Sequence, residues 1–226
     1  RCLALANYLE KLKAKVIFIC RNHYGSSHEL VLKQKFRLHL LNGKEDQEIS
    51  LKHKDWLGFS QLHDVSESSI FIDMYPGSHV IVDHYGLDCQ WESNINCESM
   101  TVIDDLADRH HKCSLLIDQS LKNTKLNYEN LVDGNFDFMG GNLVILREEF
   151  SDERAWEALG SGKVLICMGG ADPKSYTKKI LENIILNHKR CSSPQDEIEI
   201  NVIVGSACTD YDDLKSLAVT DKLKVS

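Results

Sequence analysis

The sequence predicts an α/β fold made of two Rossmann-like domains, and three observations support this. Short apolar runs rich in β-branched residues alternate with segments of helical periodicity along the chain. Several of these runs end in an aspartate. A charged segment and a Gly-Ser-Gly break separate two such series. We therefore expect a first domain over 1–150 and the start of a second domain over 151–226.

The first domain is predicted to open with a helix. Leucine and alanine side chains recur at helical spacing over residues 2–14. The run from Val16 to Cys20 is short, apolar and β-branched, as is typical of a parallel strand buried on both faces. The following elements, in chain order, are predicted to be a helix over 29–35, a strand over 36–41, a polar loop over 42–55 and a helix over 63–74.

Three further strands are predicted over 79–83, 101–104 and 115–118, and each ends in an acidic residue. Ligands of open α/β sheets bind outside the carboxyl ends of the strands, so Asp83, Asp104 and Asp118 are candidates to face one crevice. The alternative is that each carboxylate caps the helix or turn that follows it. The sequence favours capping for Asp104 and leaves both interpretations open for the other two aspartates.

The second series begins after a charged helix expected from Arg147 to Leu159 and a break at 160–162. Its elements are predicted as a strand over 163–167, a helix over 174–189, a strand over 198–204 and a helix over 211–218. The loop from Met168 to Pro173 follows a strand and precedes a helix. Its glycines would let the backbone approach a ligand, and the helix N-terminus would offer N–H groups to a phosphate. The alternative is a tight turn without a ligand.

Composition excludes several classes of protein. The formal net charge is −8, which disfavours binding to a phosphate backbone, so no nucleic-acid partner is expected. No apolar run is long enough to span a membrane, and the first residues do not form a secretory signal. None of the eight cysteines lies in a Cys-x-x-Cys pair, and Cys20 and Cys167 are expected to be buried thiols at strand ends. Reduced thiols favour a cytoplasmic protein.

The densest group of reactive side chains follows the strand over 79–83. Asp83, His84 and Tyr85 place a carboxylate, an imidazole and a phenol side by side, and Gly86 permits a sharp turn. Histidine can act as an acid or base near neutral pH, and a tyrosine hydroxyl can donate to developing charge. The alternative is that the histidine and tyrosine are packed and fully hydrogen-bonded at the end of the strand.

A second acidic group offers three carboxylates within five positions, at Asp104, Asp105 and Asp108. On a helix, the last two could share one face and hold a metal ion. The plainer interpretation is a helix start with acidic residues in its first turn and Arg109 paired locally. We expect no metal.

Seven motifs occur in an order that resembles one family. These are Arg1–Ala6, Phe18–Arg21, Ile81–Asp88, Val102–Arg109, Leu116–Gln119, Leu146–Phe150 and Met168–Pro173. The chain is similar to the UDP-2,4-diacetamido-2,4,6-trideoxy-β-L-altropyranose hydrolases of pseudaminic acid biosynthesis and to related spore-coat polysaccharide biosynthesis proteins. The resemblance implies two Rossmann-like domains of glycosyltransferase-B type. It also implies a cytoplasmic enzyme that uses water to release UDP from the sugar with inversion, without a metal or cofactor.

The resemblance also implies which residues act. Tyr85, His84 and Asp83 are the catalytic candidates on the sugar side. The substrate-binding candidates are Arg1, Asp118, Arg147, Glu149, Gly169, Gly170 and Asp172. In the family, a first strand and a glycine-rich loop that carries the catalytic histidine lie before the segment matching Arg1–Ala6, and the nucleotide loop lies beyond Ser226. Both ends are therefore expected to be truncated, and the 226 residues alone are expected to be nearly inactive.

Two other functions stay open at this level. A glycosyltransferase of the same fold would need an acceptor and would protect the sugar from water. A non-catalytic relative would bind a nucleotide sugar without turnover. The partner expected in each case is a UDP-sugar, and the protein could also associate with, or be fused to, a sugar-activating enzyme.

Overall fold

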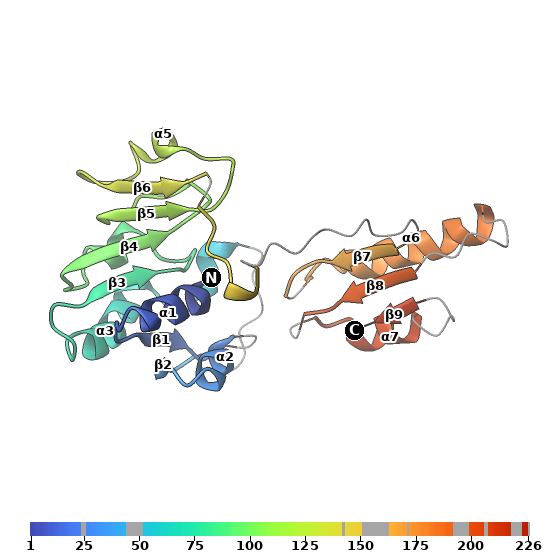
Figure 1. The fold of residues 1–226 in the computed structure, drawn as a ribbon, viewed down its shortest axis with the longest axis horizontal. Helices are drawn as coiled ribbons and strands as arrows, with labels where there is room; N and C mark the ends of the chain where they lie inside the picture. The colour runs from blue at the N-terminus through green and yellow to red at the C-terminus, as the bar shows by residue number, and fades with distance from the viewer. Residues whose placement is uncertain are drawn as a thin grey trace. The chain divides into compact units, whose positions relative to one another are not determined.

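The computed structural model describes residues 1–23, 26–43, 52–141, 143–150, 163–170, 172–191, 199–205, 208–217 and 223–225. The chain separates into two compact units, Arg1–Glu153 and Arg154–Ser226, and each is considered by itself. Within both, most strands are separated by helices along the chain, although the strand Leu115–Asp118 follows the strand Ser99–Ile103 without one, and every strand pair in the described ranges is parallel (Figure 1). The α/β class with parallel sheets is therefore confirmed.

The first unit opens with α1 (Cys2–Lys11), β1 (Ile17–Arg21), α2 (His28–Lys33) and β2 (Arg37–Leu41). The predicted helix over 2–14 ends early because Lys13 adopts a positive φ of 68°, which a continuing helix does not allow. β1 and β2 form a two-stranded parallel sheet in which Ile17 pairs with Arg37 and Arg21 pairs with Leu41.

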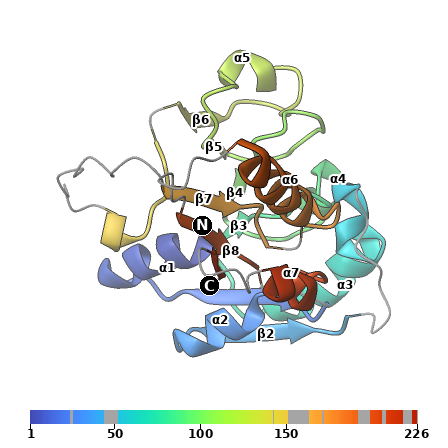
Figure 2. The same ribbon diagram turned by 90° about the vertical axis from the view of Figure 1, so that its right-hand side faces the viewer.

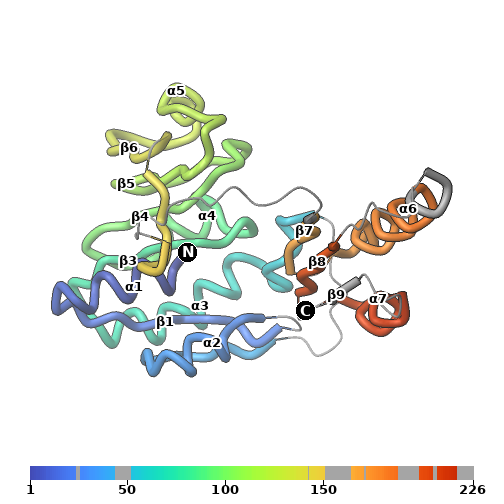
Figure 3. Tube along the Cα trace, turned by 45° about the vertical axis from the view of Figure 1, so that its right-hand side comes forward, coloured from blue at the N-terminus to red at the C-terminus, as the bar shows by residue number. Residues whose placement is uncertain are grey.

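The chain then continues through a 3₁₀ turn and a four-stranded sheet. These elements are η1 (His53–Leu57), α3 (Gln61–Ile72), β3 (His79–Val82), α4 (Cys89–Glu92), β4 (Ser99–Ile103), β5 (Leu115–Asp118), α5 (Lys125–Tyr128), β6 (Asp137–Gly140) and η2 (Glu148–Phe150). The strand order is β3-β4-β5-β6, as Figures 1 and 3 show. The carboxyl ends of β3, β4 and β5 therefore lie along one edge of one sheet, which is the edge expected for a ligand site.

The side chains of β1 alternate between two hydrophobic clusters. Phe18 and Cys20 pack with Ala6 of α1 and Val31 of α2, whereas Ile19 packs in the main core that includes Ile72 of α3. Because successive strand residues point to opposite faces, α1 and α2 cover one face of the β1–β2 sheet and α3 lies on the other. The main core continues through buried residues of β3, β4 and β5, which include Val82, Val102 and Leu116.

The expectation that β1 is buried on both faces is only partly correct. Ile17 to Cys20 are half-buried, and only Arg21 is fully buried. Both faces do carry packed helices, so the exposure has another source. Among the described strands β1 pairs with β2 alone, which leaves its other edge without a neighbour.

The second unit contains β7 (Lys163–Cys167), α6 (Tyr176–Cys191), β8 (Glu199–Ile203), α7 (Tyr211–Leu217) and β9 (Leu223–Val225). Its parallel sheet has the order β7-β8-β9. Leu181 of α6 and Leu214 of α7 are fully buried against Ile166 and Val202 of the sheet. Both helices lie beside these strands in Figures 2 and 3.

Three local expectations need correction. No helix begins at Asp104, because residues 104–110 form turns instead. The Cys167 thiol is exposed, since it follows the buried Ile166 and therefore points to the opposite face of β7. The charged helix predicted from Arg147 to Leu159 lies mostly outside the described residues, of which 148–150 form the 3₁₀ turn η2.

Candidate functional site

Asp83 follows the last residue of β3 and is joined to the start of α1. The Arg1 Nη2 donates to Asp83 Oδ1 at 2.6 Å, and the Cys2 thiol donates to Asp83 Oδ2 at 3.2 Å. Both charged side chains are partly exposed, at 28% for Arg1 and 19% for Asp83. The carboxyl end of β3 therefore carries an ion pair that solvent and a ligand can reach.

Tyr85 connects this ion pair to a second carboxylate. Its hydroxyl donates to Asp105 Oδ1 at 2.6 Å, and Arg1 Nη1 lies 3.5 Å from Asp105 Oδ2. We call Arg1, Asp83, Tyr85 and Asp105 the Arg1 cluster. Burial and the hydrogen bond to Asp105 raise the pKa of Tyr85, so the phenol keeps its proton at neutral pH. The cluster thus offers a protonated phenol, one guanidinium and two carboxylates.

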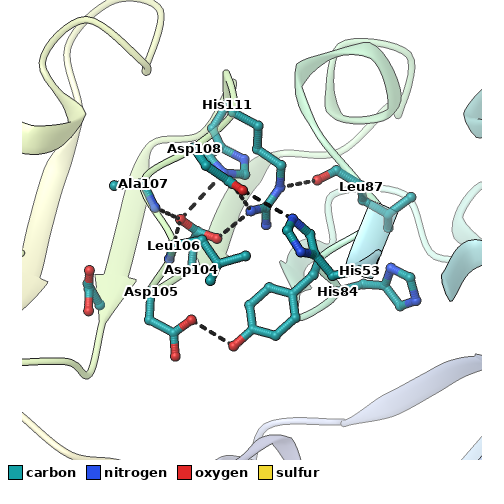
Figure 4. Close-up of polar contacts among 12 residues, drawn as sticks. His53, His84, Leu87, Asp104, Asp105, Leu106, Ala107, Asp108 and His111 are labelled. Atoms are coloured by element: carbon teal, nitrogen blue, oxygen red, sulfur yellow. Dashed lines mark hydrogen bonds and ion pairs between the residues drawn. The ribbon is translucent and has the colours of Figure 1, made fainter. Parts of the chain in front are cut away.

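The ring of Tyr85 is enclosed by cations and aromatic side chains. The guanidinium carbons of Arg1 and Arg109 lie 6.0 and 5.8 Å from the ring centroid. The rings of His53 and Trp56, both on η1, are each centred 6.0 Å away. His53 Nε2 lies 3.1 Å from Asp108 Oδ2, which ties η1 to the loop after β4 (Figure 4). These contacts hold the phenol in place.

His84 is held in its neutral form. Its Nδ1 accepts a hydrogen bond from the Gly86 N–H at 3.0 Å, so the ring proton is on Nε2. Burial lowers the pKa of His84, which also favours the neutral imidazole. A Cβ at position 86 would lie 3.0 Å from the imidazole, so glycine permits this tight turn. With Nδ1 occupied, His84 is suited to donate from Nε2 rather than to act as a base.

Asp104, at the end of β4, is fully buried and bonded to its own turn. Its Oδ2 accepts from the N–H groups of Leu106 and Ala107 at 3.3 and 3.0 Å, and its Oδ1 lies 2.7 Å from Arg109 Nη1. Figure 4 shows these contacts. The capping interpretation therefore holds for Asp104, and Arg109 pairs locally as expected, although on a turn rather than a helix.

Asp118, at the end of β5, is also fully buried. It accepts from the Ser120 N–H at 2.7 Å, the Asn123 amide at 2.9 Å and the Tyr128 hydroxyl at 2.8 Å. Burial alone would raise the pKa of Asp118, but these hydrogen bonds outweigh it and lower the pKa. The same Tyr128 hydroxyl lies 3.1 Å from Asp104 Oδ2, so one phenol joins the two buried carboxylates.

A buried pair that the sequence did not indicate lies beside this network. His111 Nδ1 is 2.7 Å from Glu92 Oε1, and both side chains are at most 1% exposed. The other Glu92 oxygen accepts from the Lys112 N–H at 2.5 Å. We call Asp104, Asp118, Tyr128, Glu92 and His111 the buried network. The three strand-end aspartates are thus not equivalent, since two belong to the buried network and Asp83 belongs to the Arg1 cluster.

Arg147 lies just before η2 and Glu149 lies on it. The Arg147 Nη2 is 2.7 Å from Glu149 Oε1. Their side chains are mostly exposed, at 67% and 56%. The described contacts of these two residues do not reach the Arg1 cluster. Their role as substrate ligands stays a prediction.

In the second unit, the predicted nucleotide-side loop follows β7. Gly169 has a φ of +80°, and the next glycine faces open space on its Cβ side. A Cβ on Gly205, after β8, would lie 2.2 Å from the Gly170 carbonyl oxygen, so the absence of a side chain lets these two loops meet.

Asp172 caps the helix that follows this loop. Its carboxylate accepts from the N–H groups of Tyr176 and Thr177 at 3.0 and 2.7 Å. Burial would raise the pKa of Asp172, but these hydrogen bonds lower it. Two of the helix N–H groups that were expected to face a phosphate are therefore bonded to Asp172. The backbone of Gly169 and Gly170 is the part of the loop that stays open to a ligand.

Sequence reasoning grouped Asp83, His84 and Tyr85 correctly as neighbours but missed their partners. Asp105 was considered only as a metal ligand. Its place in the motif Val102–Arg109 was the sequence feature that could have identified it as a site residue. Nothing in the sequence pattern pointed to His53 or Trp56, because η1 is short and distant in the chain. In the described ranges, no group of three or more His, Cys, Asp or Glu side chains is arranged to hold a metal ion. No helix among them could cross a membrane.

Comparison with known proteins gives weak but specific similarities. No protein-family profile matches the chain. It is 28% identical over 163 residues to an uncharacterized protein of Methanocaldococcus jannaschii, covering 65% of this chain and 32% of that protein. It is 30% identical over 109 residues to the UDP-2,4-diacetamido-2,4,6-trideoxy-beta-L-altropyranose hydrolase of Campylobacter jejuni, covering 46% and 39% of the two chains. The matches thus cover 32% and 39% of the lengths of these two curated relatives, and the relationship of the chain to the hydrolase is distant.

Proposed function

We propose that this chain is part of an enzyme that hydrolyses a UDP-linked diacetamido-trideoxy sugar to UDP and the free sugar. The similarity to the Campylobacter hydrolase supports the substrate class. The observation that carries the proposal is the Arg1 cluster, in which a protonated phenol lies between a guanidinium and two carboxylates at the carboxyl end of β3. Ligand sites of open α/β sheets occupy this position.

In the proposed reaction, water attacks the anomeric carbon from the face opposite UDP. The water oxygen forms the new bond to carbon, the bond from carbon to the UDP oxygen breaks, and UDP leaves with the electron pair. The proton released by the water passes to a base, and the product sugar has the inverted anomeric configuration. The protein must therefore stabilise positive charge on the sugar and negative charge on the leaving group.

The side chains at the end of β3 suit the sugar half of this reaction. Asp83 would place a carboxylate beside the developing positive charge of the ring, and the ion pair with Arg1 orients that carboxylate. Tyr85 would hold a sugar substituent through its hydroxyl, and His84 would donate from Nε2. Family resemblance places the proton-accepting histidine ahead of Arg1, so we do not assign the base to His84.

The nucleotide half is proposed for the second unit and the segment before it. The Gly169–Gly170 loop leaves backbone open for the pyrophosphate, with Asp172 fixing the helix behind it. Arg147 and Glu149, near the end of the first unit in sequence, are proposed substrate ligands, and Asp118 is proposed to position the end of β5 from within the buried network. We further propose a glycosyltransferase-B arrangement, a cytoplasmic location and a role in nonulosonic acid biosynthesis.

Hydrolysis is tested with the complete gene product that contains this chain. The protein is incubated with UDP-2,4-diacetamido-2,4,6-trideoxy-β-L-altropyranose and EDTA, without an acceptor, and followed by proton NMR. We expect UDP release with the free sugar appearing first as the opposite anomer. Intact nucleotide sugar that turns over only when an acceptor is added would instead establish a transferase, and binding without turnover would establish a binding protein.

Tyr85→Phe tests whether the Arg1 cluster does this chemistry. Loss of one hydrogen-bonding group at a reacting centre typically costs about 100-fold in turnover. We expect a loss of that order, with the folded state retained. Tyr8→Phe is the matched control, because Tyr8 is 62% exposed on α1. Normal turnover by Tyr85→Phe at normal substrate affinity would remove Tyr85 from the mechanism.

A further inference from the structure

Trp56 places a large apolar side chain next to the Arg1 cluster and leaves it open to solvent. Its side chain is 44% exposed, although its ring centroid lies only 6.0 Å from that of Tyr85. Burying an aromatic side chain is strongly favourable, since each one removes about 150–250 Å² of surface from water. An exposed indole beside a group of charged side chains is therefore a candidate contact for a ligand.

The position of Trp56 is fixed by the backbone of η1. Leu57, the next residue, is 5% exposed in the main core, and Gly58 ends the turn with a φ of 72°. A Cβ on Gly86 would lie 3.1 Å from the Lys54 carbonyl oxygen, so the glycine lets η1 pack directly against the turn after β3. The indole is therefore carried by an anchored element, as a binding residue requires.

His53 fastens the first residue of η1 to the loop after β4. Its Nε2 lies 3.1 Å from Asp108 Oδ2 (Figure 4). Its ring meets the Tyr85 ring edge-on, at an angle of 73°. η1 thus contacts the two loops that carry Tyr85 and Asp105. The three segments meet at the carboxyl edge of the sheet, where ligands of parallel sheets bind.

The rings of Tyr85 and Trp56 have different surroundings. The guanidinium carbons of Arg1 and Arg109 lie 6.0 and 5.8 Å from the Tyr85 ring centroid, so cations already lie beside this ring. The planes of the two rings meet at 56°, so they form a corner and neither ring lies flat on the other. The indole therefore offers an aromatic surface on which a ligand can pack.

The groups around the indole suit an acetamido sugar. Such a sugar presents C–H and methyl groups, which pack on aromatic rings, and also hydroxyl, amide N–H and carbonyl groups, which need polar partners. Asp83 and Asp105 accept hydrogen bonds, and Arg1 donates them. A purely apolar ligand would cover these charged groups without giving them new partners, which is unfavourable.

We propose that Trp56 determines substrate specificity by packing its indole against the C–H and methyl groups of the bound sugar. The inference rests on the proposed function, because it takes the UDP-linked diacetamido-trideoxy sugar as the ligand. This sugar has two acetamido methyl groups, and a methyl group where an ordinary hexose has a hydroxymethyl group. A hydroxyl group placed against the indole would lose hydrogen bonds to water without replacing them, so the indole favours the deoxy sugar.

Fluorine NMR tests the contact without relying on turnover. The complete gene product is labelled with 5-fluorotryptophan, and the resonance that disappears in Trp56→Phe is assigned to Trp56. An excess of UDP-2,4-diacetamido-2,4,6-trideoxy-β-L-altropyranose is added, and UDP release is followed in the same sample. The sugar nucleotide should shift the Trp56 resonance, whereas UDP alone should not.

The outcomes of this experiment separate the inference from the proposed function. An unshifted Trp56 resonance in a sample that releases UDP would overturn the inference and leave hydrolysis standing. A shift without UDP release would support the sugar contact and contradict hydrolysis. A shift caused by UDP alone would show that the indole binds the nucleotide, which overturns the inference. Neither a shift nor UDP release would overturn both.

Substrate selectivity provides a second measurement. One methyl or methylene group in an apolar contact typically changes discrimination by about tenfold or more. Trp56→Ala should raise KM for the diacetamido-trideoxy substrate about tenfold with little change in kcat, because the contact is present in the ground state as well. The inhibition constant of UDP-N-acetylglucosamine should change much less, so the ratio of the two constants should move by a similar factor. Trp56→Phe keeps an aromatic ring and should restore most of this ratio.

Tyr8→Ala is the matched control, because it removes an aromatic side chain that is 62% exposed on α1. It should leave both constants unchanged. A purely structural role for Trp56 predicts a different result, in which Trp56→Ala weakens binding of both sugar nucleotides equally. An unchanged ratio in Trp56→Ala would therefore overturn the inference.

Discussion

The carboxyl ends of β3, β4 and β5 share one sequence pattern, but the end of β3 differs in structure from the ends of β4 and β5. Each strand is an apolar run followed by aspartate. Asp83 is partly exposed and pairs with Arg1, which belongs to another element. Asp104 and Asp118 are fully buried and accept hydrogen bonds from backbone N–H groups two or three residues later.

The comparison shows that a strand-end aspartate does not by itself indicate a ligand site. The difference depends on whether the following turn brings backbone N–H groups to hydrogen-bond the carboxylate. After β4, Ala107 adopts a positive φ of 50°, and its N–H reaches Asp104. After β3, the N–H of Gly86 in the turn bonds to His84 instead, and the partners of Asp83 are the side chains of Arg1 and Cys2 at the start of α1. An aspartate held by side chains alone is available for chemistry.

The largest expected effect lies in the buried network. Glu92→Ala removes the acceptor of two hydrogen bonds, one to the buried His111 ring and one to the Lys112 N–H. A buried polar group left without its partner typically costs about 1–3 kcal/mol, so the free energy of unfolding should fall by about 2–5 kcal/mol, measured by urea denaturation. Glu98→Ala, at an exposed position, is the control and should have little effect. A loss below about 1 kcal/mol for Glu92→Ala would show that the pair is not a structural element.

A smaller effect is expected from Asp118→Asn, which keeps the shape of the side chain but loses an acceptor. The cost should be about 1–3 kcal/mol at neutral pH. Because the pKa of Asp118 is lowered in the folded state, its contribution is present above the ordinary carboxyl pKa and is lost as the pH falls through the folded-state pKa.

The difference between wild type and Asp118→Asn should therefore stay nearly constant from pH 7 to about 4, and it should shrink only as the pH is lowered further. Urea denaturation at several pH values measures this. Asp133→Asn, at an exposed position, should show no such trend. A difference that grows on acidification would mean that Asp118 is protonated in the folded protein.

The smallest effect is expected at the surface pair Arg147–Glu149. Both side chains are more than half exposed, and such pairs contribute about 0–1 kcal/mol. Arg147→Ala should therefore leave the midpoint of urea denaturation almost unchanged. A double-mutant cycle with Glu149→Ala gives the coupling directly, and a coupling above about 1 kcal/mol would show that the pair is structural.

Much of the fold was predictable because its strands are short apolar runs with clear ends. The strands beginning near Ile17, His79 and Ser99 lie within two residues of their predicted positions. The helices α4 and α5 were missed, since four residues are too few to show a helical period. The strand β6 was missed because its sequence, Asp-Phe-Met-Gly, lacks the β-branched apolar run of the predicted strands.

The site was predictable only where its residues are adjacent in sequence. Asp83, His84 and Tyr85 were grouped because they follow one strand. The hydrogen bond from Tyr85 to Asp105 depends on the parallel pairing of β3 and β4, which places the two strand ends side by side. The Glu92–His111 pair is likewise set by packing across 19 positions and has no local signal.

The central claim is that the end of β3 performs chemistry while the ends of β4 and β5 maintain structure. The most direct measurement compares Asp83→Asn with Asp104→Asn in the complete gene product, recording both UDP release from the UDP-sugar and unfolding by urea. The account predicts that Asp83→Asn loses about 100-fold or more in turnover, with less than about 1 kcal/mol change in stability. Asp104→Asn should lose about 1–3 kcal/mol of stability, and its folded fraction should keep near-normal turnover. The reverse assignment of the two losses would contradict the account.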